Sequence, residues 1–138
     1  MLRAQQPFIT RDLTQKMVFL TGPRQVGKTY LAQEIAKSFR KSVYLNYDYF
    51  EDRDIIKKAG WLLDTELLIL DELHKMKGWK NYLKGVYDTK PGSLKIIVTR
   101  SARLDMLRRS GDSMAGRFFN HRLNPLSIVE LPVDAETN

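Results

Sequence analysis

The sequence predicts an α/β protein built on a five-stranded, mostly parallel sheet with helices on both faces. Short apolar runs alternate with segments of helical period, a glycine-rich segment joins the first run to the first helix, and the third run ends in two carboxylates. Such alternation is typical of parallel strands joined by crossover helices. The five expected strands cover residues 17–21, 42–46, 66–70, 94–99 and 117–123.

Helical segments separate these strands. A helix is expected over 28–39, where apolar residues recur at four-residue spacing, and a short one through 55–59. A third helix has an apolar stripe at i, i+3, i+4, i+7 and i+8, which we expect to be core. The stripe consists of Trp79, Tyr82, Leu83, Val86 and Tyr87.

Composition restricts the class of protein. The 138 residues are 43% hydrophobic and 28% charged, the balance of a soluble globular domain, and the lack of cysteine excludes disulfides and thiolate metal sites. The longest apolar runs have four residues and no apolar signal core opens the chain, so we expect a cytoplasmic protein without a membrane partner. The net charge of +7 is spread along the sequence, so it leaves a nucleic-acid partner open without establishing one.

A phosphate-binding motif (Walker A), GxxxxGK[ST], covers residues 22–29 as GPRQVGKT. It lies between an expected strand and an expected helix, the context that the motif requires. Glycine lets the backbone approach phosphates, which the loop N–H groups and the helix N-terminus attract. We expect Lys28 to contact the β- and γ-phosphates and Thr29 to ligate Mg²⁺. The predicted nucleotide-binding residues are Gly22, Pro23, Arg24, Gln25, Val26, Gly27, Lys28, Thr29 and Tyr30.

Two carboxylates follow the third apolar run, as in a Walker B motif. At the carboxyl end of a parallel strand they would face the crevice where such sheets bind ligands. We expect Asp71 to hold Mg²⁺, directly or through its water, and Glu72 to deprotonate the water that attacks the γ-phosphate. Thr99, at the end of the fourth strand, is a candidate contact of the γ-phosphate or of this water; the alternative is a strand-end threonine without that role. No NKxD guanine-reading motif is present, so ATP is expected rather than GTP.

Five segments together resemble the predicted prokaryotic AAA-type ATPases, whose ATPase core is usually followed by a C-terminal domain of unknown function. The segments are TGPRQVGKT, LLILDELHK, WKNYLKGVYD, the stretch from IIVT through SARLDMLRRSGDSMAGRF, and NPLSIVEL. The resemblance implies a P-loop core with strand order 5-1-4-3-2. It also implies the same site residues: Lys28 and Thr29 as phosphate and Mg²⁺ contacts, Asp71 and Glu72 as the acidic pair, and Thr99 as the polar sensor.

The resemblance further implies an arginine that stabilises charge on the γ-phosphate, with Arg117, Arg108 and Arg109 as open candidates. In AAA-like assemblies this arginine usually comes from a neighbouring subunit, so the resemblance leaves open that the chain forms a homo-oligomer. The sequence departs from the family at Arg100, where members usually carry glycine. This long cation would either crowd the γ-phosphate site or supply charge to it.

The chain ends at Asn138, where relatives continue into a helical lid and a further domain. We therefore expect residues 1–138 to form a single ATPase core that hydrolyses ATP with Mg²⁺, though weakly in isolation. The alternative is a nucleotide-responsive interaction module with little turnover, associated or not with nucleic acid.

Overall fold

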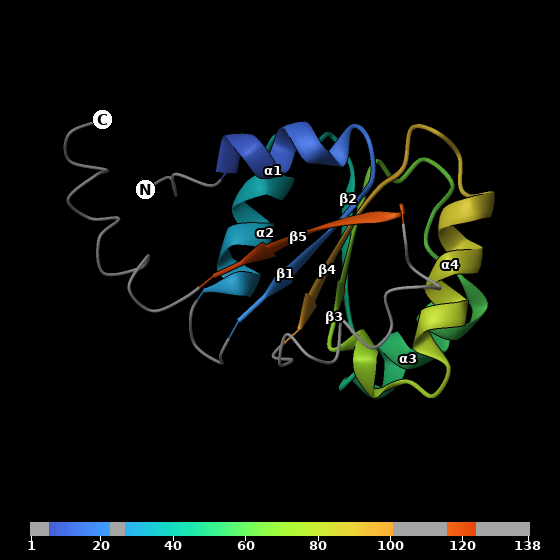
Figure 1. Cartoon of the computed structure of the whole chain (residues 1–138). Helices are drawn as coiled ribbons and strands as arrows, with labels where there is room; N and C mark the ends of the chain where they lie inside the picture. The colour runs from blue at the N-terminus through green and yellow to red at the C-terminus, as the bar shows by residue number, and fades with distance from the viewer. Residues whose placement is uncertain (1–5, 23–26, 101–115, 124–138) are drawn as a thin grey trace.

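The fold is a parallel sheet between two layers of helices (Figure 1). The computed structural model describes residues 6–22, 27–100 and 116–123. The strands are β1 (Met17–Thr21), β2 (Ser42–Asn46), β3 (Leu67–Asp71), β4 (Lys95–Arg100) and β5 (Phe118–Arg122). The helices are α1 (Gln6–Leu13), α2 (Lys28–Ala36), α3 (Phe50–Lys58), α4 (Trp79–Thr89) and the short 3₁₀ helix η1 (Leu73–Lys75).

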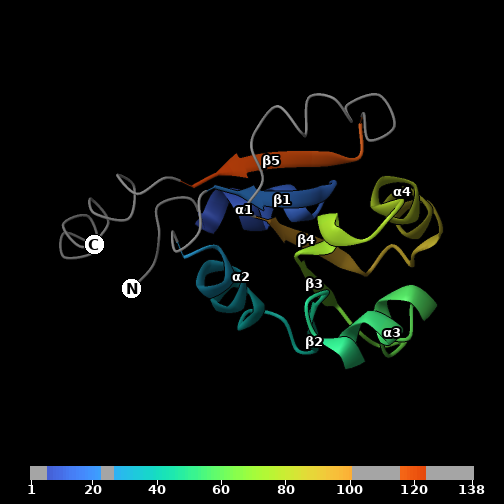
Figure 2. The ribbon, with the colours of Figure 1, turned by 90° about the horizontal axis from the view of Figure 1, so that it is seen from below.

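The strand order is β2-β3-β4-β1-β5, and all four pairings between these strands are parallel. Viewed from below, the five strands follow one another in this order, with α1 and α2 on one face and α3 and α4 on the other (Figure 2). The expected α/β class, five strands and order 5-1-4-3-2 are confirmed. Because every strand runs the same way, the carboxyl ends of β1, β3 and β4 meet at one edge of the sheet.

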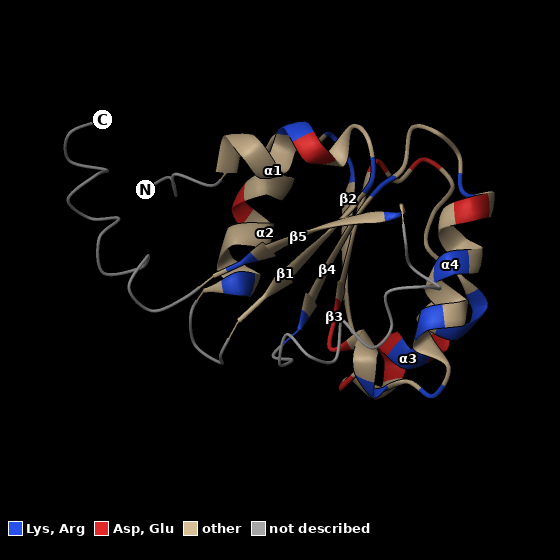
Figure 3. Ribbon diagram, viewed as in Figure 1, with Lys and Arg blue, Asp and Glu red and all other residues tan. Residues whose placement is uncertain are grey.

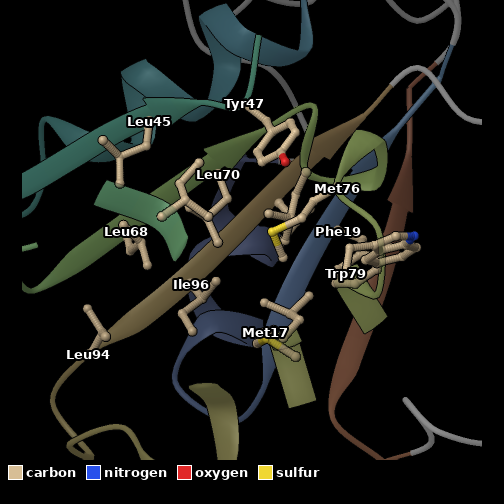
Figure 4. Packing of buried hydrophobic residues seen from close by; sticks show 14 residues of the cluster. Met17, Phe19, Leu45, Tyr47, Leu68, Leu70, Met76, Trp79, Leu94 and Ile96 are labelled. Carbon is tan, nitrogen blue, oxygen red and sulfur yellow. The ribbon is translucent and has the colours of Figure 1, made fainter. Parts of the chain in front are cut away.

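Successive strand residues point to opposite faces, which divides the core in two. On the face covered by α3 and α4, Phe19 packs against Trp79 with ring centroids 6.3 Å apart, among residues such as Leu68, Leu70 and Ile96 (Figure 4). The other cluster lies under α1 and α2. It contains Val18, Leu20, Ile69, Ile97, Leu31 and Ile35. Alternate residues of a strand therefore pack against different helices, one set against α1 and α2 and the other against α3 and α4.

Several boundaries differ from the prediction. Helix α2 ends at Ala36 rather than at residue 39, because the chain tightens into i→i+3 turns and the Ser38 hydroxyl donates to the carbonyl of Ile35 at 2.7 Å. Strand β3 starts one residue later than expected and includes Asp71, and β4 includes Arg100. Helix α1, which buries Ile9 and Leu13 against the sheet, is not predicted from the sequence.

Among the described residues, no helix is both long and apolar enough to cross a lipid bilayer.

Candidate functional site

The glycine-rich segment leaves β1 and enters α2 at the carboxyl edge of the sheet. Gly22 and Gly27 have φ of 148° and 86°, values that L-residues with a side chain rarely adopt. Gly27 caps α2, and its carbonyl accepts the first helical hydrogen bond, from the Leu31 N–H at 2.9 Å. Both motif glycines therefore occur where the backbone requires glycine. The predicted nucleotide contacts Pro23, Arg24, Gln25 and Val26 lie outside the described residues.

Lys28 and Thr29 are the first two residues of α2, and their side chains have different surroundings. Lys28 is 7% exposed, and its ammonium donates to the Gly22 carbonyl at 3.0 Å, so the charge lies against the start of the loop. The Thr29 hydroxyl donates to Asp71 Oδ2 at 3.2 Å, which joins the loop to the end of β3. Tyr30 follows on the helix surface and is half exposed.

The Asp71 carboxylate is the centre of a hydrogen-bond cluster. Besides Thr29, the Tyr44 hydroxyl donates to Oδ2 at 2.6 Å, and the Thr99 hydroxyl donates to Oδ1 at 2.7 Å. Asp71 is 6% exposed and Thr99 is fully buried. A buried carboxylate is costly unless donors satisfy it, and here three hydroxyl groups from α2, β2 and β4 do so. The structure thus brings Thr29, Asp71 and Thr99 together at the carboxyl edge of the sheet.

These oxygen donors fit a magnesium ion. Mg²⁺ prefers oxygen ligands in octahedral geometry at 2.0–2.1 Å, which places neighbouring ligand oxygens about 3 Å apart. The hydroxyl of Thr29 and Oδ2 of Asp71 are separated by 3.2 Å, close to that spacing. No group of three or more His, Asp or Glu side chains in the described ranges forms an all-protein metal cage. Mg²⁺ in such sites is usually shared between one or two protein oxygens, water and phosphate.

Glu72 follows directly but has a different backbone. Its N–H donates to the Thr99 carbonyl at 3.1 Å, and its φ of 59° and ψ of 27° place it in the left-handed region, where it caps η1. That conformation costs about 1–2 kcal/mol for a residue other than glycine. Strained backbone of this kind clusters at functional sites. Figure 3 shows the acidic residues at this end of β3.

The Glu72 carboxylate lies among charged neighbours. Its Oε1 is 3.5 Å from His74 Nε2 and 3.6 Å from the ammonium of Lys75, which also contacts both carboxylate oxygens of Asp48 at 2.8 and 3.0 Å. Burial raises the pKa of Glu72, the Asp71 charge raises it further, and Lys75 works in the opposite direction. Burial and the charge of Arg100 lower the pKa of His74, so its imidazole is neutral at pH 7. Glu72 is therefore a carboxylate with increased basicity.

Of the arginines considered as sources of charge for the phosphate, Arg117 and Arg100 belong to the described residues. Arg117 precedes β5, at the opposite edge of the sheet, and forms a bidentate pair with Asp88 at 3.0 and 3.1 Å. Arg100 is buried with its guanidinium 4.7 Å from the centre of the Trp79 ring, on the α4 face, whereas Thr99 points to the α2 face. Burial lowers the pKa of Arg100 to about 10, and the Glu72 charge opposes that shift. Arg108 and Arg109 lie outside the described residues.

Sequence reasoning missed Tyr44, Asp48 and Lys75. A signal for Tyr44 existed, because Asn46 is in register with Asp71 and residues two apart in a strand share a face. A hydroxyl at position 44 would then lie on the same face as the Asp71 carboxylate. Lys75 had no comparable signal, because its contact with Asp48 depends on how η1 packs beside the end of β2.

The sheet order, the glycine conformations and the strand-end carboxylates define a P-loop nucleoside-triphosphatase fold. The sequence pattern of a family described as an AAA domain matches residues 14–132, and the chain belongs to that family. No curated protein matches the chain.

Among solved structures, the chain is similar to a Pif1 helicase from Bacteroides in complex with ADP-AlF3 and ssDNA. The TM-score is 0.54 and the sequence identity is 14%, over 90% of this chain and 42% of the helicase chain. At this identity the likeness concerns the fold, and the chain spans less than half the length of that protein.

Proposed function

We propose that this chain binds ATP with Mg²⁺ and hydrolyses it at the carboxyl edge of its sheet. The observation that supports this most directly is the contact between α2 and β3, in which the hydroxyl of Thr29 lies 3.2 Å from Asp71 Oδ2. The next residue, Glu72, is a carboxylate with a raised pKa. A phosphate loop, a pair of oxygen donors for Mg²⁺ and a second carboxylate are the parts that hydrolysis of a nucleoside triphosphate needs.

Each residue has a role that follows from its position. Lys28 and the loop N–H groups attract the phosphates, and the N-terminus of α2 adds its partial positive charge. Thr29 and Asp71 would hold Mg²⁺, which neutralises charge on the phosphate oxygens when bound. Glu72 accepts a proton from water, and its raised pKa favours that transfer because a general base works best near the operating pH. Thr99 keeps Asp71 oriented through its hydrogen bond.

A second candidate is a nucleotide-responsive module with little turnover of its own. The placement of the arginines favours it: Arg117 is bound to Asp88 at the far edge of the sheet, and Arg100 lies on the α4 face. An arginine directed at the transferring phosphate is worth about 10³–10⁵ in rate. If a second subunit supplies that arginine, the isolated chain would retain ATP far better than it cleaves it.

The net charge of +7 leaves nucleic acid open as a macromolecular partner, both for an ATPase and for a nucleotide-responsive module. Binding to phosphates releases counterions, so the logarithm of the affinity would fall linearly with the logarithm of salt concentration. Titration of the protein with a single-stranded oligonucleotide at several salt concentrations tests whether it binds nucleic acid in this way. Binding that is absent even at low salt would reject it.

The test of the proposed function compares two site variants with two exposed controls. Calorimetry with Mg²⁺ and ATP should show strong loss of binding in Lys28→Ala, whereas Glu72→Gln should bind normally and release no phosphate. Lys57→Ala and Glu51→Gln remove a charge from exposed positions of α3 and should match the parent in both assays. Equal ATP affinity of Lys28→Ala and the parent would overturn the site, and parental hydrolysis by Glu72→Gln would overturn the general base.

A further inference from the structure

Tyr44 makes the shortest hydrogen bond to the Asp71 carboxylate. Its Oη lies 2.6 Å from Oδ2, against 2.7 Å for Thr99 at Oδ1 and 3.2 Å for Thr29 at Oδ2. A hydroxyl that donates to an ionised carboxylate typically lies 2.5–2.7 Å from it, and such bonds are about twice as strong as neutral ones. Tyr44 is therefore a strong partner of the carboxylate that would hold Mg²⁺.

The donor and acceptor roles around the Tyr44 hydroxyl are fixed by its other neighbour. Asn46 Nδ2 donates to Tyr44 Oη at 3.2 Å, while Asn46 Oδ1 accepts from the Asp48 N–H at 2.8 Å. The second bond sets which end of the Asn46 amide faces Tyr44. Since an N–H group already donates to Oη and a phenol has one proton, that proton is directed to Asp71.

Strand pairing holds these groups in place independently of the phosphate loop. Asn46 is in register with Asp71, and Tyr44 is in register with Ile69 two residues earlier. The Tyr44 ring packs against the apolar cluster under α2. Thr99 from β4 and Tyr44 from β2 thus each donate a hydrogen bond to one oxygen of the Asp71 carboxylate, from the two sides of β3. Rotation of the carboxylate would break at least one of the two bonds.

We propose that Tyr44 is a positioning residue for the metal site, one that holds Oδ2 of Asp71 in the orientation that Mg²⁺ requires. This inference rests on the proposed function, because it concerns the same metal ligand. Partners that orient a ligating carboxylate typically change metal affinity by about 10–100-fold when they are removed. Removal of the Tyr44 hydroxyl should therefore weaken the response to Mg²⁺ and leave the contribution of the loop to ATP binding unchanged.

The experiment is a Mg²⁺ titration of ATP binding in Tyr44→Phe, which keeps the ring and removes one hydroxyl. We expect the Mg²⁺ concentration at half effect to rise about 10–100-fold, with ATP affinity in EDTA equal to that of the parent. The matched control is Tyr82→Phe, since the Tyr82 hydroxyl donates to the Ile56 carbonyl on the α3 side. That variant loses a hydroxyl of the same kind, and its Mg²⁺ requirement should equal that of the parent.

The outcomes separate this inference from the proposed function. A parent that binds ATP without any response to Mg²⁺ would overturn both. A parent that responds to Mg²⁺ and a folded Tyr44→Phe with the same requirement would overturn the role of Tyr44 alone. If Tyr44→Phe does not fold, Asn46→Ala provides the test, because it removes the group that directs the Tyr44 proton. A raised Mg²⁺ requirement in that variant supports the inference, and an unchanged one refutes it.

Discussion

Replacement of Thr99 by valine tests whether the buried cluster at Asp71 stabilises the fold as well as the site. Valine has nearly the shape of threonine and suits a strand, so the substitution exchanges one hydroxyl for one methyl group. The lost bond is the 2.7 Å contact with Asp71 Oδ1. Thr99 is fully buried and Asp71 is 6% exposed, so little water can replace the missing donor.

The magnitude follows from two opposing contributions. A hydrogen bond to a charged group contributes about 1.5–3 kcal/mol to stability. The added methyl group returns up to about 0.8 kcal/mol through apolar burial. The net loss should therefore be about 1–2 kcal/mol. With a urea m-value of about 2 kcal/mol/M, the unfolding midpoint should fall by about 0.5–1 M.

The assay is urea unfolding of Thr99→Val beside a matched control, Thr65→Val. Thr65 is also buried, at 4% exposure, but its hydroxyl has no hydrogen-bond partner among the described residues. Thr65→Val should therefore leave the midpoint unchanged or raise it. If both variants shift the midpoint equally, the bond from Thr99 to Asp71 contributes nothing net and the reasoning fails.

Two further predictions concern charge. Because burial raises the pKa of Glu72 above its ordinary 4.5, the stabilising contribution of this group is complete below pH 4.5 and is lost as pH rises through the folded-state pKa. Glu72→Gln should thus raise the melting temperature at pH 7, with a gain that shrinks as pH falls; a constant gain across a fluorimetric pH series would contradict this. For the arginine, ATPase activity per mole of chain should increase with protein concentration, in step with oligomer formation followed by light scattering. Arg117 pairs with Asp88 and Arg100 packs on Trp79, so a neighbouring subunit is the expected source of the arginine that acts on the phosphate. Efficient turnover by a monomer at every concentration would reject a donor from a second subunit.

Much of the sheet could be predicted from the sequence because buried parallel strands are nearly continuous apolar runs. Strands β1 and β2 were located to the residue, and the other three within one residue at each end. Helix α1 was missed because it is short and places only Ile9 and Leu13 in the core, so its apolar period is weak. Short helices depend on tertiary packing more than on propensity, and packing is not visible in a local pattern.

The site was predictable where it depends on strand ends and unpredictable where it depends on local backbone or packing. Thr29, Asp71 and Thr99 converge because the carboxyl ends of parallel strands meet at one edge. The left-handed backbone of Glu72 has no sequence signal, since non-glycine residues adopt it rarely. The packing of Arg100 on Trp79 could not be predicted without knowing where α4 lies on the sheet.

The central place of β1 has a consequence for synthesis of the chain. Val18 pairs with Ile97 and with Phe119, so both strand neighbours of β1 are made about 80–100 residues after it. At a translation rate of about 5–20 residues per second, β1 would emerge several seconds before either neighbour. Its five residues, MVFLT, are all buried in the folded sheet, and unpaired apolar strands of this kind aggregate readily. During translation, β1 must therefore be shielded from aggregation, by α1 or by a chaperone, until β4 and β5 have been synthesised.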